Sequence, residues 1–171
     1  MKKLFFALML MFASVVALNA QSLTSNTWMT TLPGEDELVV VMNFEADGTC
    51  ALVVASEEVE EDSGMKMTVN VACIVPGVYD LNGDDLLITF DNSNADVNLD
   101  YEIEGVDAQT KKMMDAMIKP ELEKQKPELK QSILSSIPQF GAMKVVSVDK
   151  EKLVLADGKG VELTFVPTPG E

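Results

Sequence analysis

The feature that most constrains the fold is a series of short segments in which apolar residues alternate with polar ones, with turn residues between the segments. Alternation with period two places every second side chain on the same face of a β-strand. The pattern recurs between residues 23 and 106 and returns over residues 142–166. We therefore expect a mainly β fold, in which an antiparallel meander buries one shared apolar face.

The first well-marked hairpin is predicted around Ala46-Asp47-Gly48. A three-residue turn with Gly48 in the left-handed region pairs Phe44 with Cys50 and keeps both apolar sets on one face. A two-residue turn would place Phe44 opposite Ala51 instead, so we expect the longer turn. The residues that share this face are Leu38, Val40, Met42, Phe44, Cys50, Leu52 and Val54.

Three later features are predicted to reverse or bend the chain. The acidic stretch 57–64 is expected to be the next reversal, and Pro76-Gly77 is expected to bulge or bend the strand that follows it. Asn82-Gly83 is a strong hairpin signal between two further strands. The strand that directly follows the acidic reversal shows an apolar face made by Met65, Met67, Val69, Val71, Cys73 and Val75.

A helical insertion is predicted over residues 108–137, where apolar residues recur at mostly helical spacing. Asp107 is a suitable N-cap. Pro120 and Pro127 each remove a hydrogen bond from the helix interior, so we expect two or three short helices or one kinked helix.

The first twenty residues have the pattern of a secretory signal peptide. Lys2 and Lys3 precede an apolar run over residues 4–18, and the small residue Ala20 ends the segment. The run is shorter than the roughly twenty residues of a membrane span. We expect cleavage after Ala20, export to the periplasm or the medium, and no membrane-embedded segment afterwards; the alternative is a retained anchor helix.

The chain is strongly acidic. Residues 1–20 hold two of the 13 lysines and none of the 28 acidic residues, so residues 21–171 carry 11 lysines against 28 acids, a formal charge of −17. This charge repels phosphate backbones and anionic surfaces and attracts cationic partners. We therefore expect no nucleic-acid partner, and a cationic protein partner remains open.

The composition also excludes much familiar chemistry, because the chain has no histidine and all its basic residues are lysine. Histidine-dependent nucleophiles, histidine-ligated zinc and guanidinium clamps are absent. Asp80-Leu81-Asn82-Gly83-Asp84 lacks the glycine that a calcium loop needs at its sixth place, where Asp85 stands. We expect no catalytic residues, no metal and no cofactor, and hence no enzyme.

Cys50 and Cys73 are the only cysteines, and both fall on predicted inward faces. A symmetric reversal over residues 57–64 would place them nearly opposite each other, and export makes a disulfide available. The alternative is two buried free thiols.

Several residues together resemble the small exported lipocalin-like (calycin) domains of Gram-negative bacteria. They are an early Trp28, Phe44 before Asp47-Gly48-Thr49, and Gly77-Val78-Tyr79 before the Asn-Gly hairpin. The family's G-x-W opening stands here as Ser25-Asn26-Thr27-Trp28, without the glycine, and the helical insertion is an addition. The resemblance implies that residues 21–171 form one eight-stranded antiparallel barrel, interrupted at about 108–137 by the insertion.

The resemblance also implies that the barrel could hold a small apolar or neutral molecule. An eight-stranded barrel encloses either packed side chains or one small ligand, so these residues could equally be plain core. The alternative function is an acidic interaction module, an inhibitor or scaffold that binds a cationic partner and has no small-molecule ligand. The predicted apolar pocket, beneath a helical lid, consists of Met42, Phe44, Leu52, Met65, Met67, Val69, Met113 and Met117.

Overall fold

The computed structural model of the protein describes residues 22–32 and 38–168, apart from the side chains of Ser136 and Pro138. The predicted signal peptide therefore lies outside the described residues. In chain order the elements are β1 (Trp28–Leu32), β2 (Leu38–Phe44), β3 (Thr49–Asp62), β4 (Met65–Asn82), β5 (Asp85–Phe90), η1 (Asn92–Asn94), β6 (Asp96–Glu104), α2 (Ala108–Ser136), η2 (Ile137–Phe140), β7 (Ala142–Val148), β8 (Leu153–Asp157) and β9 (Glu162–Pro167).

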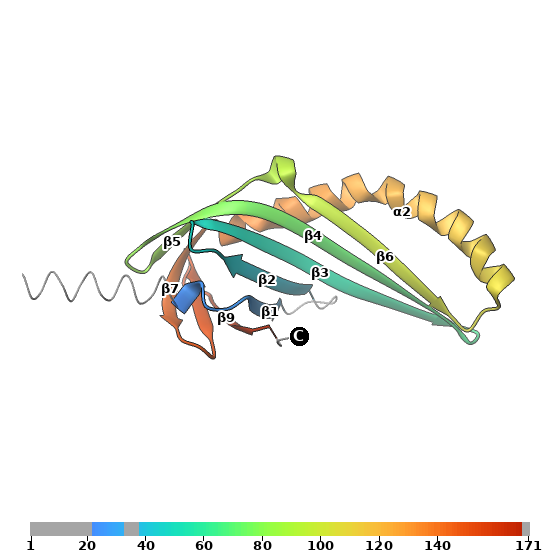
Figure 1. The fold of residues 1–171 in the computed structure, drawn as a ribbon, viewed down its shortest axis with the longest axis horizontal. Coiled ribbons are helices and arrows are strands. Elements are labelled where there is room, and N and C mark those ends of the chain that lie inside the picture. The colour runs from blue at the N-terminus through green and yellow to red at the C-terminus, as the bar shows by residue number, and fades with distance from the viewer. Residues whose placement is uncertain (1–21, 33–37, 169–171) are drawn as a thin grey trace, which may run out of the picture.

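Eight strands close into an antiparallel barrel, which confirms the predicted fold class (Figure 1). Around the ring the order is β1, β2, β3, β4, β5, β7, β8 and β9. Two seams are short, because β9 joins β1 through two residue pairs and β5 joins β7 through three. The sixth strand, β6, lies outside the ring and pairs with β4 alone.

Large apolar side chains occupy the barrel interior, and several of them are wholly buried. Trp28 donates its indole N–H to the carbonyl of Leu23 at 2.7 Å, which satisfies the one polar group of this side chain inside the core. After the end of α2, Ile137 and Phe140 join the same cluster, so the helical insertion is anchored in the core. The largest buried side chains are Trp28, Phe44, Phe140, Phe165, Leu23, Met42, Leu52, Leu86, Ile137, Leu153 and Leu155.

The turn at Asp47-Gly48 is as predicted. Phe44 pairs with Cys50, and Gly48 has a φ of 87°, in the region that favours glycine. The hairpin at Asn82-Gly83 also forms, with Asn82 paired to Asp85. These turns set the register that turns the apolar residues of β2 and β3 inward.

The chain reverses within residues 57–64, as predicted, but the turn occupies only the end of that stretch. β3 continues as a strand to Asp62, and β4 begins at Met65. The turn itself is only Ser63 and Gly64, whose φ values are 52° and 86°. A two-residue type I′ hairpin turn requires positive φ at both of these positions. The acidic side chains of residues 57–62 remain exposed to solvent, so they do not prevent these residues from pairing as a strand.

The predicted bulge at Pro76-Gly77 is also wrong, because the register of β3 and β4 runs through it without a shift. On its other edge β4 pairs with β6 up to Ile74 and with β5 from Gly77 onward. Pro76 lies in the gap between these two partners. A residue without a backbone N–H suits that position, and its carbonyl accepts from the N–H of Asp91 at 2.8 Å.

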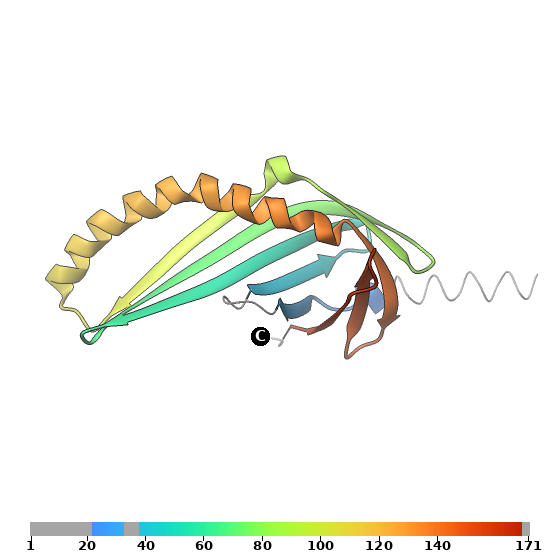
Figure 2. The same ribbon diagram turned by 180° about the vertical axis from the view of Figure 1, so that it is seen from behind.

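Beyond the barrel, three strands continue as an arm (Figures 1 and 2). The arm comprises residues 56–62 of β3, residues 65–74 of β4, and β6. From its tip α2 returns to the barrel alongside β6. The arm and the barrel are therefore continuous parts of one sheet.

The insertion is a single helix, so the prediction of separate short helices is wrong. Asp107 caps it as predicted, accepting from the N–H groups of Gln109 and Thr110 at 2.9 and 3.0 Å. Pro120 and Pro127 lie seven residues apart, which is nearly two turns, and both are exposed on its outer side. The helix curves over the arm, and its outer side is the convex one (Figure 2). The hydrogen bonds that the two prolines remove are tolerated on this side, because water takes their place.

Gly105 at the arm tip supports a stability prediction. A Cβ at this position would stand 2.0 Å from the carbonyl oxygen of Gly64, and Gly105 has a φ of 79°. We expect Gly105→Ala to lower the free energy of unfolding by about 1–3 kcal/mol, measured by urea denaturation.

The matched control for this substitution is Gly158→Ala, because Gly158 has no atom within 4 Å of an added Cβ and no positive φ. It should leave the urea midpoint within experimental error. Equal effects of the two substitutions would show that the tip of the arm is not packed as described.

Candidate functional site

The eight residues of the predicted pocket lie in three separate regions. Met42, Phe44 and Leu52 belong to the barrel core, with exposed fractions of 2%, 1% and 0%. At such exposure their side chains fill the interior together with the residues around them. These three residues therefore do not border a vacant interior in this structure.

The other five predicted pocket residues lie on the arm and its helix. Met65, Met67 and Val69 are half-buried on the apolar face of β4. Met113 and Met117 are 63% and 75% exposed. The structure does not bring them over the core residues.

The exposure of Met113 and Met117 follows from the side of α2 that meets the sheet. Asp115 accepts a hydrogen bond from the hydroxyl of Tyr101 on β6 at 2.6 Å, so Asp115 marks the inner side. Each methionine is two residues away, about 200° round the helix. Both therefore face solvent and do not close a lid over the sheet.

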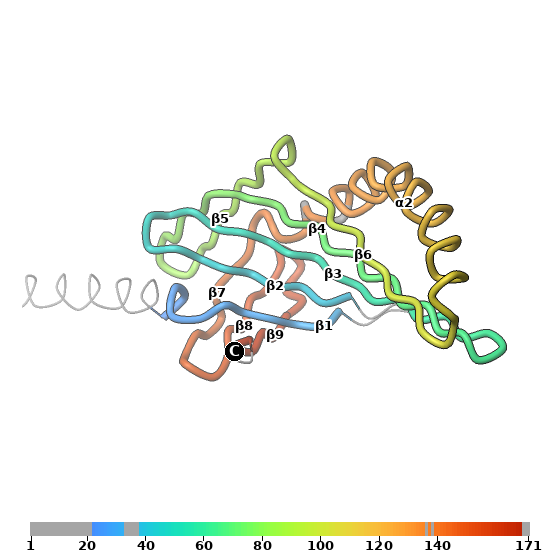
Figure 3. Tube along the Cα trace, turned by 45° about the vertical axis from the view of Figure 1, so that its right-hand side comes forward, coloured from blue at the N-terminus to red at the C-terminus, as the bar shows by residue number. Residues whose placement is uncertain are grey.

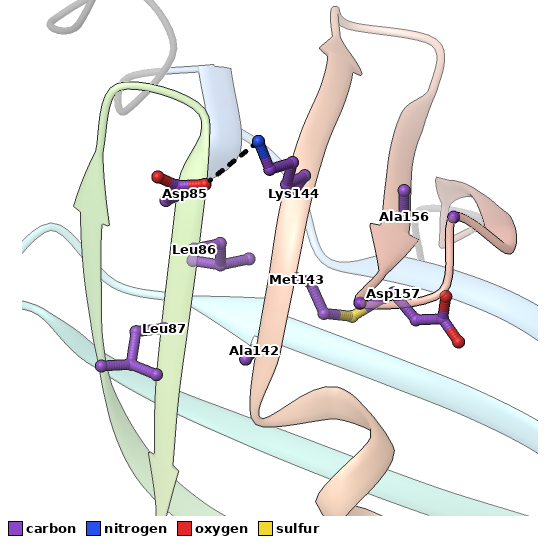
Figure 4. A pocket seen from close by; sticks show the side chains of 10 residues that line it. Asp85, Leu86, Leu87, Ala142, Met143, Lys144, Ala156 and Asp157 are labelled. Carbon is purple, nitrogen blue, oxygen red and sulfur yellow. Dashed lines mark ion pairs between the residues drawn. The ribbon is translucent and has the colours of Figure 1, made fainter.

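A surface hollow of about 500 Å³ is a candidate ligand site because of its apolar lining (Figure 4). It spans β5, β7, β8 and the turn after β8. Most of the exposed surface that lines it is apolar. The lining residues are Asp85, Leu86, Leu87, Ala142, Met143, Lys144, Ala156, Asp157, Gly158 and Gly160.

The hollow lies across the short seam between β5 and β7. Only three residue pairs join these strands, and one of them places Leu87 opposite Ala142. Leu87 is 56% exposed, an unusual position for a large apolar residue in a strand. The seam therefore presents apolar side chains to solvent on the outside of the barrel.

Charged groups stand at the border of the hollow. Lys144 lies 3.6 Å from Asp85, and both side chains are more than two-thirds exposed. Such an exposed pair contributes little to stability. It leaves Lys144 partly neutralised, while Asp157 contributes a further carboxylate to the lining.

An anionic head group would need a lysine or tyrosine side chain, and Lys144 and Tyr79 are two residues of that kind. Tyr79 donates its hydroxyl to the carbonyl of Glu45 at 2.9 Å and packs edge-on against Phe44, with ring centroids 5.1 Å apart. Burial raises the pKa of the Tyr79 phenol. Tyr79 thus holds the β2–β3 turn, and it does not line the hollow that Lys144 borders.

Most of the hollow was missed by the sequence reasoning, which followed inward-facing residues only. One signal was present, because the doublet Leu86-Leu87 puts an apolar residue on the outer face of a strand that otherwise alternates. Ala142, Ala156 and the glycines carry no such signal. They meet only because β7 and β8 fold beside β5.

Cys50 and Cys73 are both buried free thiols. Cys50 pairs with Gly77 and Cys73 with Val54, so the two cysteines stand four residues apart along the ladder, about 13 Å. A disulfide needs Cα atoms within about 7 Å. The expected near-opposite placement is therefore wrong, because the turn lies at Ser63-Gly64, later than a symmetric reversal over 57–64 requires.

Burial also disfavours the thiolate form of both cysteines. It raises the pKa of Cys50 to about 11, and it raises the pKa of Cys73 although the charge of Lys130 acts in the opposite direction. The thiolate is the reactive form, and a raised pKa keeps its population small at neutral pH.

The acidic loops have structural partners of their own. Asp91 accepts from the Ser93 hydroxyl, from the side-chain amide of Asn94 and from the backbone N–H groups of both residues, and these bonds lower its pKa. Asp47 makes equivalent bonds to Thr49. Among the described residues, no three histidine, cysteine, aspartate or glutamate side chains are grouped so that they could hold a metal ion.

No protein-family model matches the chain, and no curated protein matches it either. The fold itself is a closed eight-stranded antiparallel barrel with one helix inserted between β6 and β7, which is consistent with a lipocalin-like fold. Of the helices in the described ranges, none has both the length and the apolar character that a membrane crossing requires.

The thiol assignment makes a direct prediction. Alkylation with iodoacetamide under denaturing, non-reducing conditions should add two carbamidomethyl groups, because both cysteines are free. In the folded protein at pH 8 the same reaction should be at least tenfold slower than in urea, since burial suppresses thiolate formation and access. Intact mass spectrometry measures both; a mass without any added group would establish a disulfide.

Proposed function

We propose that the protein is an exported lipocalin-like binding protein, and that it holds a small apolar or neutral molecule in the hollow over β5, β7 and β8. The observation that carries this proposal is an apolar hollow of about 500 Å³ beside the short β5–β7 seam. Its size lies within the usual range for small-molecule sites. The barrel is the scaffold, and the ligand binds at its outer surface.

The chemistry of the hollow favours an uncharged ligand. Leu87, Ala142 and Ala156 offer apolar contacts, while Asp85 and Asp157 would repel an anion. A cation would meet Lys144 at the same border. Because the hollow is open to solvent, it covers only part of a ligand, and we expect micromolar affinity rather than tighter binding.

Export is the second part of the proposal. It is supported by the charged, apolar and small-residue order of residues 1–20, and by the resemblance to exported domains of Gram-negative bacteria. The proposal also holds that the protein binds without catalysing a reaction, because the chain lacks histidine and shows no nucleophile motif.

The ligand site can be tested with the neutral dye N-phenyl-1-naphthylamine, which fluoresces when it leaves water. We expect saturable fluorescence with the purified protein. Leu87→Gln should weaken dye binding about 3- to 10-fold, because it removes apolar contact area at the seam. Ala142→Trp, which fills part of the hollow, should also weaken it.

A matched control is Val166→Gln on β9, since Val166 is an exposed outer-face residue, 46% accessible, that does not line this hollow. Dye binding should be unchanged in this variant. If Leu87→Gln and Ala142→Trp bind the dye like the parent protein, the ligand site is not in the hollow and the proposal fails.

Export predicts a defined mature terminus. When the full chain is expressed in a Gram-negative host, protein recovered from the periplasm should begin at Gln21, as read by N-terminal sequencing. A version with Lys2 and Lys3 replaced by Glu should stay in the cytoplasm with its first twenty residues, because the basic n-region is lost. Recovery of uncleaved chain in the membrane fraction would favour an anchor helix instead.

A further inference from the structure

The outer edge of β3 in the arm is a strand edge that the described residues leave without a partner. β2 pairs with β3 only as far as Ala55, opposite Val39. Beyond that point β3 continues to Asp62, paired on its β4 side throughout. Figure 3 shows the β3–β4 hairpin continuing past the end of β2.

The hydrogen bonding decides which backbone groups face this edge. Tyr79 donates its backbone N–H to the Gly48 carbonyl at 2.9 Å, in the register that β3 and β4 continue. Hydrogen-bonded and non-bonded pairs alternate along an antiparallel ladder, so even-numbered residues of β3 bond to β4. The odd-numbered Glu57, Val59 and Glu61 therefore direct their N–H and C=O groups away from β4, outward.

The opposite edge of the arm is blocked by α2. By the same alternation, the odd-numbered residues of β6 point away from β4. Lys111 of α2 donates to the Ile103 carbonyl at 3.5 Å, and Lys130 donates to the carbonyl of Ala95, just before β6. The helix thus supplies hydrogen bonds on this edge, and no described element does so for β3.

The acidic side chains along this edge of β3 determine which kind of strand could pair with it. Five of the six residues from 57 to 62 are acidic, and all six are exposed. A second copy of the chain would bring the same acids opposite these and would be repelled. A cationic segment would gain both strand hydrogen bonds and opposite charges on each face of the edge.

We propose that residues 57–61 of β3 bind an extended, lysine- or arginine-rich polypeptide segment, which adds to the arm as a further strand. Backbone pairing with Glu57, Val59 and Glu61 provides the hydrogen bonds, and the acidic side chains select the charge of the segment. A cationic partner, which the acidic net charge of the chain would attract, thereby has a defined surface. It is independent of the hollow over β5, β7 and β8, which lies on other strands.

The test uses the full chain and a fluorescein-labelled seven-residue peptide of alternating lysine and threonine, with fluorescence anisotropy as the readout. Binding should be saturable at 20 mM salt and at least threefold weaker at 200 mM, because exposed charges are screened. A glutamate–threonine peptide of the same length should not bind. Equal binding of the two peptides would overturn the charge selection.

Backbone pairing is tested by Val59→Pro. Proline removes an N–H that points outward and so leaves the β3–β4 bonds in place. The affinity for the lysine–threonine peptide should fall at least tenfold, whereas Val59→Thr, the matched control, should bind like the parent protein. The double variant Glu57→Gln, Glu61→Gln should bind more weakly and with a smaller salt dependence.

Peptide modification keeps the test decisive if Val59→Pro alters the fold, which circular dichroism will reveal. The backbone nitrogens of the peptide are methylated either at the odd-numbered or at the even-numbered positions, which gives two probes of nearly equal charge. A strand presents one set of N–H groups to its partner, so one probe should lose binding and the other should keep it. If both probes bind like the parent peptide, strand addition is wrong; if neither lysine–threonine peptide nor its analogues bind at 20 mM salt, the proposal fails.

Discussion

The whole structure depends on the continuous pairing of β3 with β4. Fourteen residue pairs join these strands from Thr49 to Asp62 without a register shift. On its other side β4 meets β6 first and β5 afterwards, with Pro76 between them. One ladder therefore forms a wall of the barrel and also the axis of the arm, and α2 can pack beside β6 only because that ladder extends so far.

Both surfaces proposed for binding lie outside the barrel interior. The interior is occupied by large side chains such as Trp28, Phe44 and Phe165. The two surfaces proposed for binding share a physical origin, because each lies where strand pairing is incomplete. At the β5–β7 seam the short pairing exposes apolar side chains, and on β3 beyond Ala55 no described strand pairs with the outward backbone groups.

Predictions from the sequence were confirmed where a few neighbouring residues determine their own conformation. Gly48 requires a left-handed position and so sets Phe44 opposite Cys50, and Asp107 caps the helix through its own side chain. Sequence reasoning misjudged the length of the turn in residues 57–64, because a run of acidic residues is typical of a loop. The predicted turn position put Cys73 nearly opposite Cys50, whereas in the structure Cys73 stands opposite Val54, since in a hairpin every pairing follows from the position of the turn.

By itself the sequence determined the strands, their inward faces, most turns and the helical insertion, because alternation, glycine positions and caps act over a few residues. Only the tertiary structure decided that Met42, Phe44 and Leu52 are packed in the core, that Met113 and Met117 face solvent, and that Leu87 meets Ala142 across a seam. These outcomes depend on which distant strands become neighbours. No local pattern encodes that choice, since it is made by the packing of the whole core.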